Sequence, residues 1–145
     1  MVEIRRLGPD DLPLVFAAQH LFDNPVQEAA ARRFLDSADH HLLLALEREG
    51  QQPVGFISGV EVTHPDKGTE MFLYELAVDE PFRRQGIAKL LVRALTDLAL
   101  RRGCYGMWVG VDPDNTAARA TYRSSGAEQP EDAVIFNWSF SPPRV

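Results

Sequence analysis

Two adjacent arginines precede a glycine in the run Arg83-Arg84-Gln85-Gly86-Ile87-Ala88, where the pattern changes from an expected strand to an expected helix. Positive side chains at a helix start oppose the helix dipole, at a cost of roughly 0.3–1 kcal/mol each when exposed. A bound anion reverses this cost, because free backbone N–H groups at the start of a helix point towards it. Gly86 has no side chain to block the approach of such a ligand. The run favours a diphosphate-binding turn, with a solvated basic turn as the alternative.

Two widespread phosphate-binding motifs are missing from this turn. A Walker loop ends in Gly-Lys-Ser or Gly-Lys-Thr, and a Rossmann turn carries three spaced glycines. The residues around Gly86 fit neither pattern. The turn therefore argues against a nucleoside triphosphatase and against a Rossmann dinucleotide site.

A carboxylate interrupts an apolar strand just before this turn. Residues 71–78 alternate as a strand does, which predicts that Glu75 shares a face with Met71, Leu73 and Ala77. Burying an unpaired charge is expensive, so a carboxylate in such a place is paired or functional. Removal from water would raise the pKa of Glu75 and make it a proton acceptor near neutral pH. The alternative is a structural ion pair with an arginine.

Other acidic and reactive side chains are weaker candidates. Glu61, Asp112 and Asp114 are alternative bases, although Asp114 also suits the N-cap of a helix that begins near Asn115.

The histidine, cysteine and tryptophan residues of this chain are expected to have structural roles. His40 and His41 are adjacent and cannot both face one metal ion from a strand, so we expect no metal site. The sequence near Cys104 shows no histidine that would activate its thiol as a nucleophile. Cys104 is therefore expected to be a small core residue. Trp108 and Trp138 lie in strand patterns and are expected in the core.

The elements that must hold these residues follow the order strand, two helices, three strands, helix, strand, helix, strand. A strand–helix–strand unit over residues 71–111 argues for parallel pairing within a mixed sheet. The expected strands are 2–5, 41–46, 54–62, 71–78, 105–111 and 133–140. The expected helices are one capped by Asp10 or Asp11, one opened by Asn24-Pro25, one ended by Arg101, Arg102 and Gly103, and one over 115–124.

Length and charge narrow the class of protein. The 145 residues suit one domain, 1–145, and no run is apolar enough for a membrane span or a signal peptide. One cysteine excludes an internal disulfide and fits the cytoplasm. The formal net charge of −6 argues against a nucleic-acid partner and suits a cationic substrate.

Three segments together resemble one enzyme superfamily. Arg83-x-x-Gly86-x-Ala88 is similar to the pyrophosphate-binding signature of the GCN5-related N-acetyltransferases (GNAT), and Leu76-Ala77-Val78 to the family's fourth strand. Asn115-x-x-Ala118-x-x-x-Tyr122-x-x-x-Gly126 resembles its second signature. The resemblance implies an α/β fold with a mixed, mostly antiparallel sheet of six to seven strands and about four helices. Strands 4 and 5 would be parallel and splayed around the coenzyme.

The resemblance also implies the roles of individual residues in acetyl transfer from acetyl-CoA. The backbone of Leu76, Ala77 and Val78 would hold the pantetheine arm and the oxyanion, and the run 83–88 would hold the diphosphate. Asn115 and Ala118 would line the coenzyme site, and Tyr122 would protonate the thiolate unless it only packs on the sheet. The base would be Glu75, with Asp112 or a water chain as alternatives.

Within the superfamily, Phe72-Leu73-Tyr74-Glu75-Leu76-Ala77-Val78 resembles the fourth strand of aminoglycoside 3-N-acetyltransferases, an antibiotic-resistance group that has aspartate where this chain has Glu75. The expected acceptor is a primary amine of a small cation such as an aminoglycoside or polyamine. A protein or peptide amine and a catalytically silent acyl-CoA-binding module are the alternatives. A homodimer is an option that the pattern leaves open.

Overall fold

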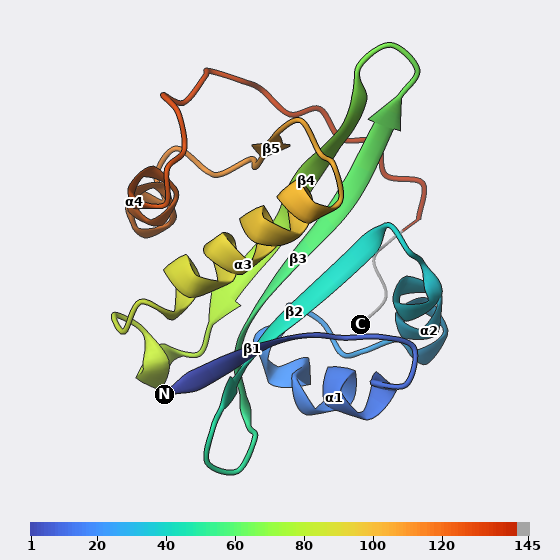
Figure 1. Ribbon diagram of the computed structural model, residues 1–145, viewed down its shortest axis with the longest axis vertical. Coiled ribbons are helices and arrows are strands. Elements are labelled where there is room, and N and C mark those ends of the chain that lie inside the picture. The colour runs from blue at the N-terminus through green and yellow to red at the C-terminus, as the bar shows by residue number, and fades with distance from the viewer. Residues whose placement is uncertain (142–145) are drawn as a thin grey trace.

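The computed structural model describes residues 1–141, in which five strands form one mixed sheet (Figure 1). The strands lie in chain order from β1 to β5. The first four pair antiparallel, and β4 pairs parallel with β5. Their bounds are Val2–Arg6 (β1), His40–Glu47 (β2), Pro53–His64 (β3), Gly68–Val78 (β4) and Met107–Trp108 (β5). A mixed, mostly antiparallel sheet with strands 4 and 5 parallel is confirmed.

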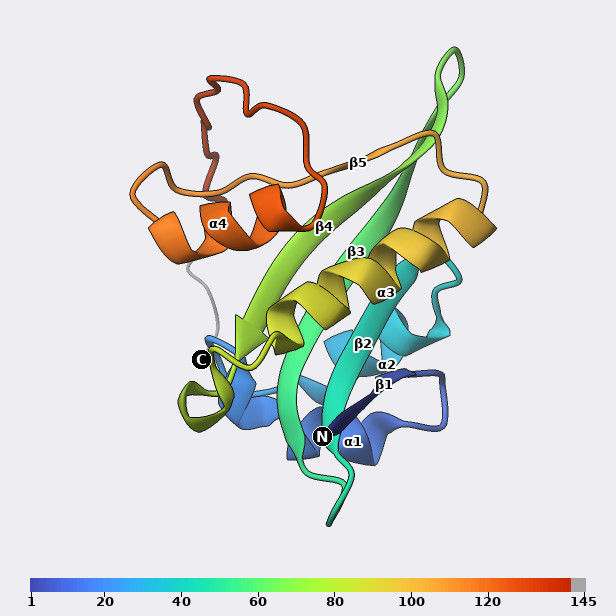
Figure 2. The same ribbon diagram turned by 60° about the vertical axis from the view of Figure 1, so that its left-hand side comes forward.

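Helices cover both faces of this sheet (Figures 1 and 2). α3 packs on one face, with α4 against it, whereas α1 and α2 pack on the other. The described residues hold four α-helices and two short 3-10 turns, in agreement with the expected number of helices. Their bounds are Leu12–Ala17 (α1), Gln19–Leu21 (η1), Glu28–Asp36 (α2), Glu80–Phe82 (η2), Ile87–Arg101 (α3) and Thr116–Ser124 (α4).

The long helix α3 is amphipathic and supplies one of the two cores. Ile87, Leu91, Leu95 and Leu98 recur at helical spacing and are all buried. They pack on the sheet so closely that a Cβ at Gly59 would lie 2.9 Å from a Leu95 methyl carbon. The helix ends at Arg101, as the basic last turn and the following glycine predict.

A bulge in β4 changes which side chains face α3. Ser58 pairs with Glu75 and Gly59 pairs with Leu73, so Tyr74 has no residue opposite it on β3. Leu73 therefore packs in the core under α3. After the bulge, Leu76 is the residue whose side chain points to this same face of the sheet. The prediction that Glu75 shares a face with Met71 and Leu73 is wrong, because the extra residue turns Glu75 towards the opposite side.

The sheet has fewer strands than the six to seven expected. Residues 105–111 contribute only the two-residue β5, and residues 133–140 form no strand within the described part of the chain. Trp108 is 50% exposed and Trp138 is 76% exposed, so the prediction that both lie in the core is wrong. Both patterns alternate like strands, but β5 pairs with β4 at only two positions, and residues 133–140 pair with no strand among residues 1–141.

Two helix starts also differ from expectation. α2 begins at Glu28 and not at Asn24-Pro25, because the backbone N–H of Val26 donates to the Gln19 Oε1 at 2.7 Å and Gln27 stays extended. The N-cap of α4 is Asn115 and not Asp114, since the Asn115 Oδ1 accepts from the N–H of Ala118 at 3.0 Å.

Candidate active site

The separation of β4 from β5 opens a cavity of about 280 Å³. The two strands pair only at Met71–Met107 and Phe72–Trp108, while β4 continues to Val78. One edge of β4 beyond Phe72 thus has no strand partner within residues 1–141, and its outward backbone groups can bind a ligand. Many of the site residues expected from the sequence line this cavity: Glu75, Leu76, Ala77, Asp112, Asn115, Ala118 and Tyr122.

Glu75 lies in this cavity beside a second carboxylate, that of Asp23. Partial burial raises the pKa of Glu75, and the charge of Asp23 and a hydrogen bond to it raise it further. None of the ion pairs within residues 1–141 involves Glu75, so the alternative of a structural arginine partner gains no support. A carboxyl group with a raised pKa is a better proton acceptor near neutral pH than an ordinary glutamate.

Asp23 was not among the residues expected from the sequence, because it lies in an irregular segment that is far from β4 in the sequence. The residues just before it are held by two contacts. The Phe22 ring meets the Phe56 ring edge-on, with centroids 4.9 Å apart. The His20 Nε2 lies 3.4 Å from the Asp79 Oδ2 at the end of β4. These contacts keep Asp23 next to the strand that carries Glu75.

Ser58 was also missed, and it pairs directly with Glu75 across the β3–β4 ladder. Its Oγ is buried and has no hydrogen-bond partner among the described residues. Directly opposed residues of an antiparallel pair point to the same face, so Ser58 and Glu75 share one face of the sheet.

The cavity is acidic. Asp23, Glu75 and Asp112 contribute three carboxylates, and its lining contains no lysine, arginine or histidine. Such a surface attracts ammonium groups and repels anions.

Tyr122 forms part of the opposite wall, on α4. Burial raises the pKa of its phenol, so the hydroxyl keeps its proton at neutral pH and can donate it. Ala118 and Asn115 lie on the same face of this helix, one and two turns before Tyr122 respectively. The Asn115 side chain is held by its cap bond to Ala118, which fixes the start of α4 rather than leaving the amide free.

The basic turn before α3 has the geometry of an anion-binding helix start. Gly86 is the N-cap with φ 79°, a left-handed conformation, and a Cβ there would meet nothing within 4 Å. Arg84 also has a positive φ of 62°. The Arg83 Nε donates to the Val78 carbonyl at 2.9 Å and ties the turn to the end of β4. The open space above Gly86 is therefore available to a ligand.

The side chains of the turn divide into two groups. Arg83, Arg84 and Gln85 are exposed, so they can reach a bound anion. The Ile87 side chain is buried in the core under α3, so only its backbone N–H can contribute to such a site. Ala88 follows in the first turn of the helix.

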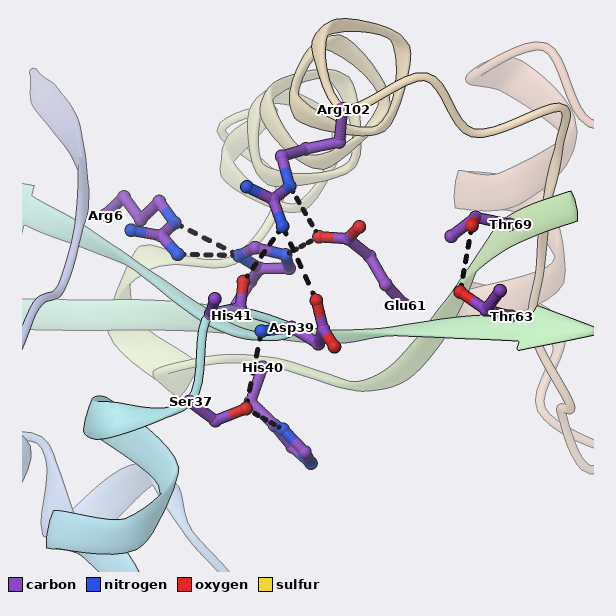
Figure 3. Close-up of polar contacts among 10 residues, drawn as sticks. Arg6, Ser37, Asp39, His40, His41, Glu61, Thr63, Thr69 and Arg102 are labelled. Atoms are coloured by element: carbon purple, nitrogen blue, oxygen red, sulfur yellow. Dashed lines mark hydrogen bonds and ion pairs between the residues drawn. The ribbon is translucent and has the colours of Figure 1, made fainter.

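Glu61 lies elsewhere, in an ion cluster that joins β2, β3 and the end of α3 (Figure 3). Its Oε2 accepts from the His41 Nε2 at 2.6 Å and from the Arg102 Nε at 2.7 Å. The other ring nitrogen of His41 accepts from Arg6. Glu61 is not part of the cavity lining, so its role as an alternative base loses support.

Cys104 is half-buried against the core under α3, and burial raises the pKa of its thiol, which opposes nucleophilic reactivity. Within residues 1–141 no group of three His, Cys, Asp or Glu side chains is placed to hold a metal ion. No helix in that range is long and apolar enough to cross a membrane.

The sequence model of the Acetyltransferase (GNAT) family matches residues 10–127. The chain belongs to this family. The match contains β4, the basic turn and α4, which are the three segments that carry the expected site.

Curated GNAT relatives differ in what they acetylate. The L-2,4-diaminobutyric acid acetyltransferase of Streptomyces coelicolor is 37% identical over 103 residues, or 68% of this chain. The [ribosomal protein bS18]-alanine N-acetyltransferase of Haemophilus ducreyi is 42% identical over 60 residues, or 41% of this chain. The alignments span 59% and 41% of the lengths of these two relatives.

Solved GNAT structures share the fold across nearly the whole chain. The aminoglycoside acetyltransferase meta-AAC0020 from an uncultured soil metagenomic sample, in complex with sisomicin, has a TM-score of 0.88 at 23% identity, with 97% of each chain covered. AAC(6')-Iy in complex with a bisubstrate analog has a TM-score of 0.80 at 20% identity, covering 96% of this chain and 99% of that one.

These structural neighbours correct the expected subgroup. β4 resembles the aminoglycoside 3-N-acetyltransferases, but the similar solved structures named for a ring position are 6'-N-acetyltransferases. The short strand motif around Glu75 therefore indicates the family and not the position that is acetylated.

Proposed function

We propose that this chain is an acetyl-CoA-dependent N-acetyltransferase that acts on a primary amine of a small cationic acceptor. The observation that carries the proposal is the acidic cavity between β4 and the chain after β5, with Glu75 on one wall and Tyr122 on the other. Family membership and the curated names of the relatives support the same reaction.

Two parts of the fold suit the coenzyme. The free edge of β4 at Leu76–Val78 offers backbone groups to the amide-containing pantetheine arm. The N–H groups from Gln85 to Ala88, flanked by Arg83 and Arg84, suit the diphosphate. When bound, acetyl-CoA supplies the acetyl group as a thioester.

The side chains in the cavity suit the proton transfers of this reaction. An amine is protonated at neutral pH, so it must first lose a proton, and Glu75 accepts it directly or through a water molecule. Backbone N–H groups of the free β4 edge donate to the developing oxyanion. The Tyr122 hydroxyl donates a proton to the departing thiolate sulfur.

Charge favours an acceptor with more than one amine. One ammonium beside Glu75 leaves the Asp23 and Asp112 carboxylates available to a second. Aminoglycosides rank first, because the structural neighbours act on them, and diaminobutyrate ranks next. The ribosomal-protein relative makes a peptide α-amine the second candidate class.

The proposal is tested by thiol release from acetyl-CoA with a panel of acceptors. The panel holds aminoglycosides, L-2,4-diaminobutyrate, a polyamine, a lysine peptide and a peptide with N-terminal alanine. We expect the highest kcat/KM with a compact acceptor of two or more amines. Preference for the alanine peptide would transfer the assignment to protein acetylation. Binding of acetyl-CoA without turnover of any amine would identify a silent acyl-CoA-binding module and overturn the proposal.

A further inference from the structure

Three aromatic rings form a row beside the candidate active site. The Phe72 ring stacks on the Trp108 ring with centroids 4.3 Å apart, and it meets the Tyr74 ring edge-on at 5.6 Å. The two outer rings are accessible, because Trp108 is 50% exposed and Tyr74 is 62% exposed. Tyr74 also lines the acidic cavity that contains Glu75. The row therefore leads out of this cavity, from β4 to β5.

The bulge in β4 explains why the row reaches the proposed base. Leu73 and Leu76 both pack in the core under α3. The side chains between them and beside them that face away from this core are Phe72, Tyr74 and Glu75. In a regular strand only every second side chain takes one face, but the extra residue places Tyr74 and Glu75 next to each other. An aromatic ring and a carboxylate are thus adjacent where the proposed acceptor reacts.

The cavity and the aromatic row together restrict the chemistry of the acceptor. The carboxylates of Asp23, Glu75 and Asp112 attract ammonium groups. The face of an aromatic ring also attracts cations, and it packs well against the C–H groups of a saturated ring. A linear diamine can satisfy the carboxylates, but it offers little surface to the aromatic rings. A saturated ring that carries ammonium groups suits both.

We propose that Tyr74 and Trp108 determine acceptor specificity by binding the rings of a cationic amino sugar whose reacting amine lies beside Glu75. This inference rests on the proposed function and specifies its acceptor class. The order of the aromatic row gives the two residues different parts of the acceptor. Tyr74, next to Glu75, binds the ring that carries the reacting amine. Trp108, on the far side of Phe72, binds a second linked ring.

Steady-state kinetics with acceptors that differ in their rings test the proposal. Neamine has two linked rings, trans-1,4-diaminocyclohexane has one, and 1,4-diaminobutane has none but carries the same two amines as the cyclohexane. Loss of a cation–π contact weakens binding by about 2–30-fold, so Tyr74→Leu should raise KM by that factor for both cyclic acceptors. Trp108→Leu should raise KM for neamine alone. Neither variant should change KM for 1,4-diaminobutane.

Two further variants separate a role in binding from a role in folding. Tyr74→Phe keeps the aromatic face and should retain the wild-type KM for neamine. Tyr105→Leu removes an aromatic ring that is 57% exposed and lies outside the cavity, and it should have no effect. An unchanged KM for neamine in Tyr74→Leu, or an equal increase for neamine and 1,4-diaminobutane, would overturn the proposal.

Calorimetry distinguishes failure of this proposal from failure of the proposed function. Neamine is titrated into the protein saturated with CoA, which has no acetyl group to transfer. Neamine that binds more weakly to Tyr74→Leu than to the wild type, but is not acetylated from acetyl-CoA, would support the aromatic site and refute the proposed function. Acetylation of 1,4-diaminobutane, with no effect of either substitution on the cyclic acceptors, would refute the aromatic site alone. Absence of neamine binding to the wild type would also overturn it.

Discussion

Asp23 lies beside Glu75 in the cavity and helps raise the pKa of the Glu75 carboxyl group, in addition to the effect of burial. The two residues are far apart in the sequence: Asp23 lies in an irregular segment after η1, and Glu75 lies in the bulged half of β4. In the proposed reaction this proximity gives Glu75 the raised pKa that suits a base, and Asp23 offers the acceptor a second anionic contact.

Removal of the Asp23 charge should change the pH profile. In Asp23→Asn the pKa of Glu75 should fall towards its usual value, so the acidic limb of kcat/KM against pH should shift to lower pH. The kcat/KM of a polyamine should fall more than that of a monoamine, because one ammonium contact is lost. Asp36→Asn, at the end of α2, is the control. If the acidic limb does not shift, Asp23 does not influence the pKa of the group that acts as the base.

Glu75→Gln keeps the shape of the side chain and removes the negative charge of the proposed base. We expect kcat/KM for the amine to fall by about 10²–10⁴-fold, with acetyl-CoA affinity unchanged by calorimetry. Glu49→Gln, in the β2–β3 turn, is the control. Full activity of Glu75→Gln on every accepted amine would transfer the base to Asp112 or to water.

Tyr122→Phe removes only the hydroxyl group. Turnover should fall, by up to about 10²–10⁴-fold for a lost general acid, while acetyl-CoA binds as before. Tyr105→Phe, an exposed tyrosine outside the cavity, should have no effect. Equal turnover of the Tyr122 variant and the wild type would identify Tyr122 as a packing residue.

Gly86→Val should weaken acetyl-CoA binding tenfold or more, because the new side chain would fill the space above the basic turn. Gly50→Val is a matched control. Gly50 also has a left-handed φ, 81°, and open space around it, so it reproduces the backbone strain away from the site. If Gly86→Val binds acetyl-CoA as tightly as Gly50→Val does, the basic turn is not part of the coenzyme site.

The ion cluster in Figure 3 should make folding sensitive to acid. Burial lowers the pKa of His41 below 6.5, outweighing its hydrogen bond to Glu61. Burial acts to raise the pKa of Glu61, but hydrogen bonds from Arg102 and His41 outweigh it, so this pKa lies below 4.5. The unfolded state therefore binds more protons as the pH falls, first below about 6.5 and then below about 4.5.

Urea unfolding at a series of pH values measures this effect. The free energy of unfolding should fall as the pH drops below 6.5, and His41→Gln should flatten this first decline. His64→Gln, at an exposed site, should keep the wild-type slope. Identical slopes for all three proteins would show that His41 does not contribute.

Local patterns predicted the parts of the site that neighbouring residues build. The periodicity of Leu91, Leu95 and Leu98 predicted α3, and the glycine at position 86 predicted the turn before it, because both depend on residues within a few positions. The motif spacing likewise predicted that Asn115, Ala118 and Tyr122 share one face of α4, since a helix fixes that relation by itself.

Contacts between distant segments decided the rest. The alternation of residues 71–78 continues through Tyr74 without a visible break. Only the pairing with β3 shows that Tyr74 is an extra residue and that Glu75 turns away from the core under α3. Asp23 reaches Glu75 only because aromatic packing and the His20–Asp79 pair hold its segment there. The strand pattern of residues 133–140 is local, but a strand exists only where another edge supplies its hydrogen bonds, and this choice belongs to the tertiary structure.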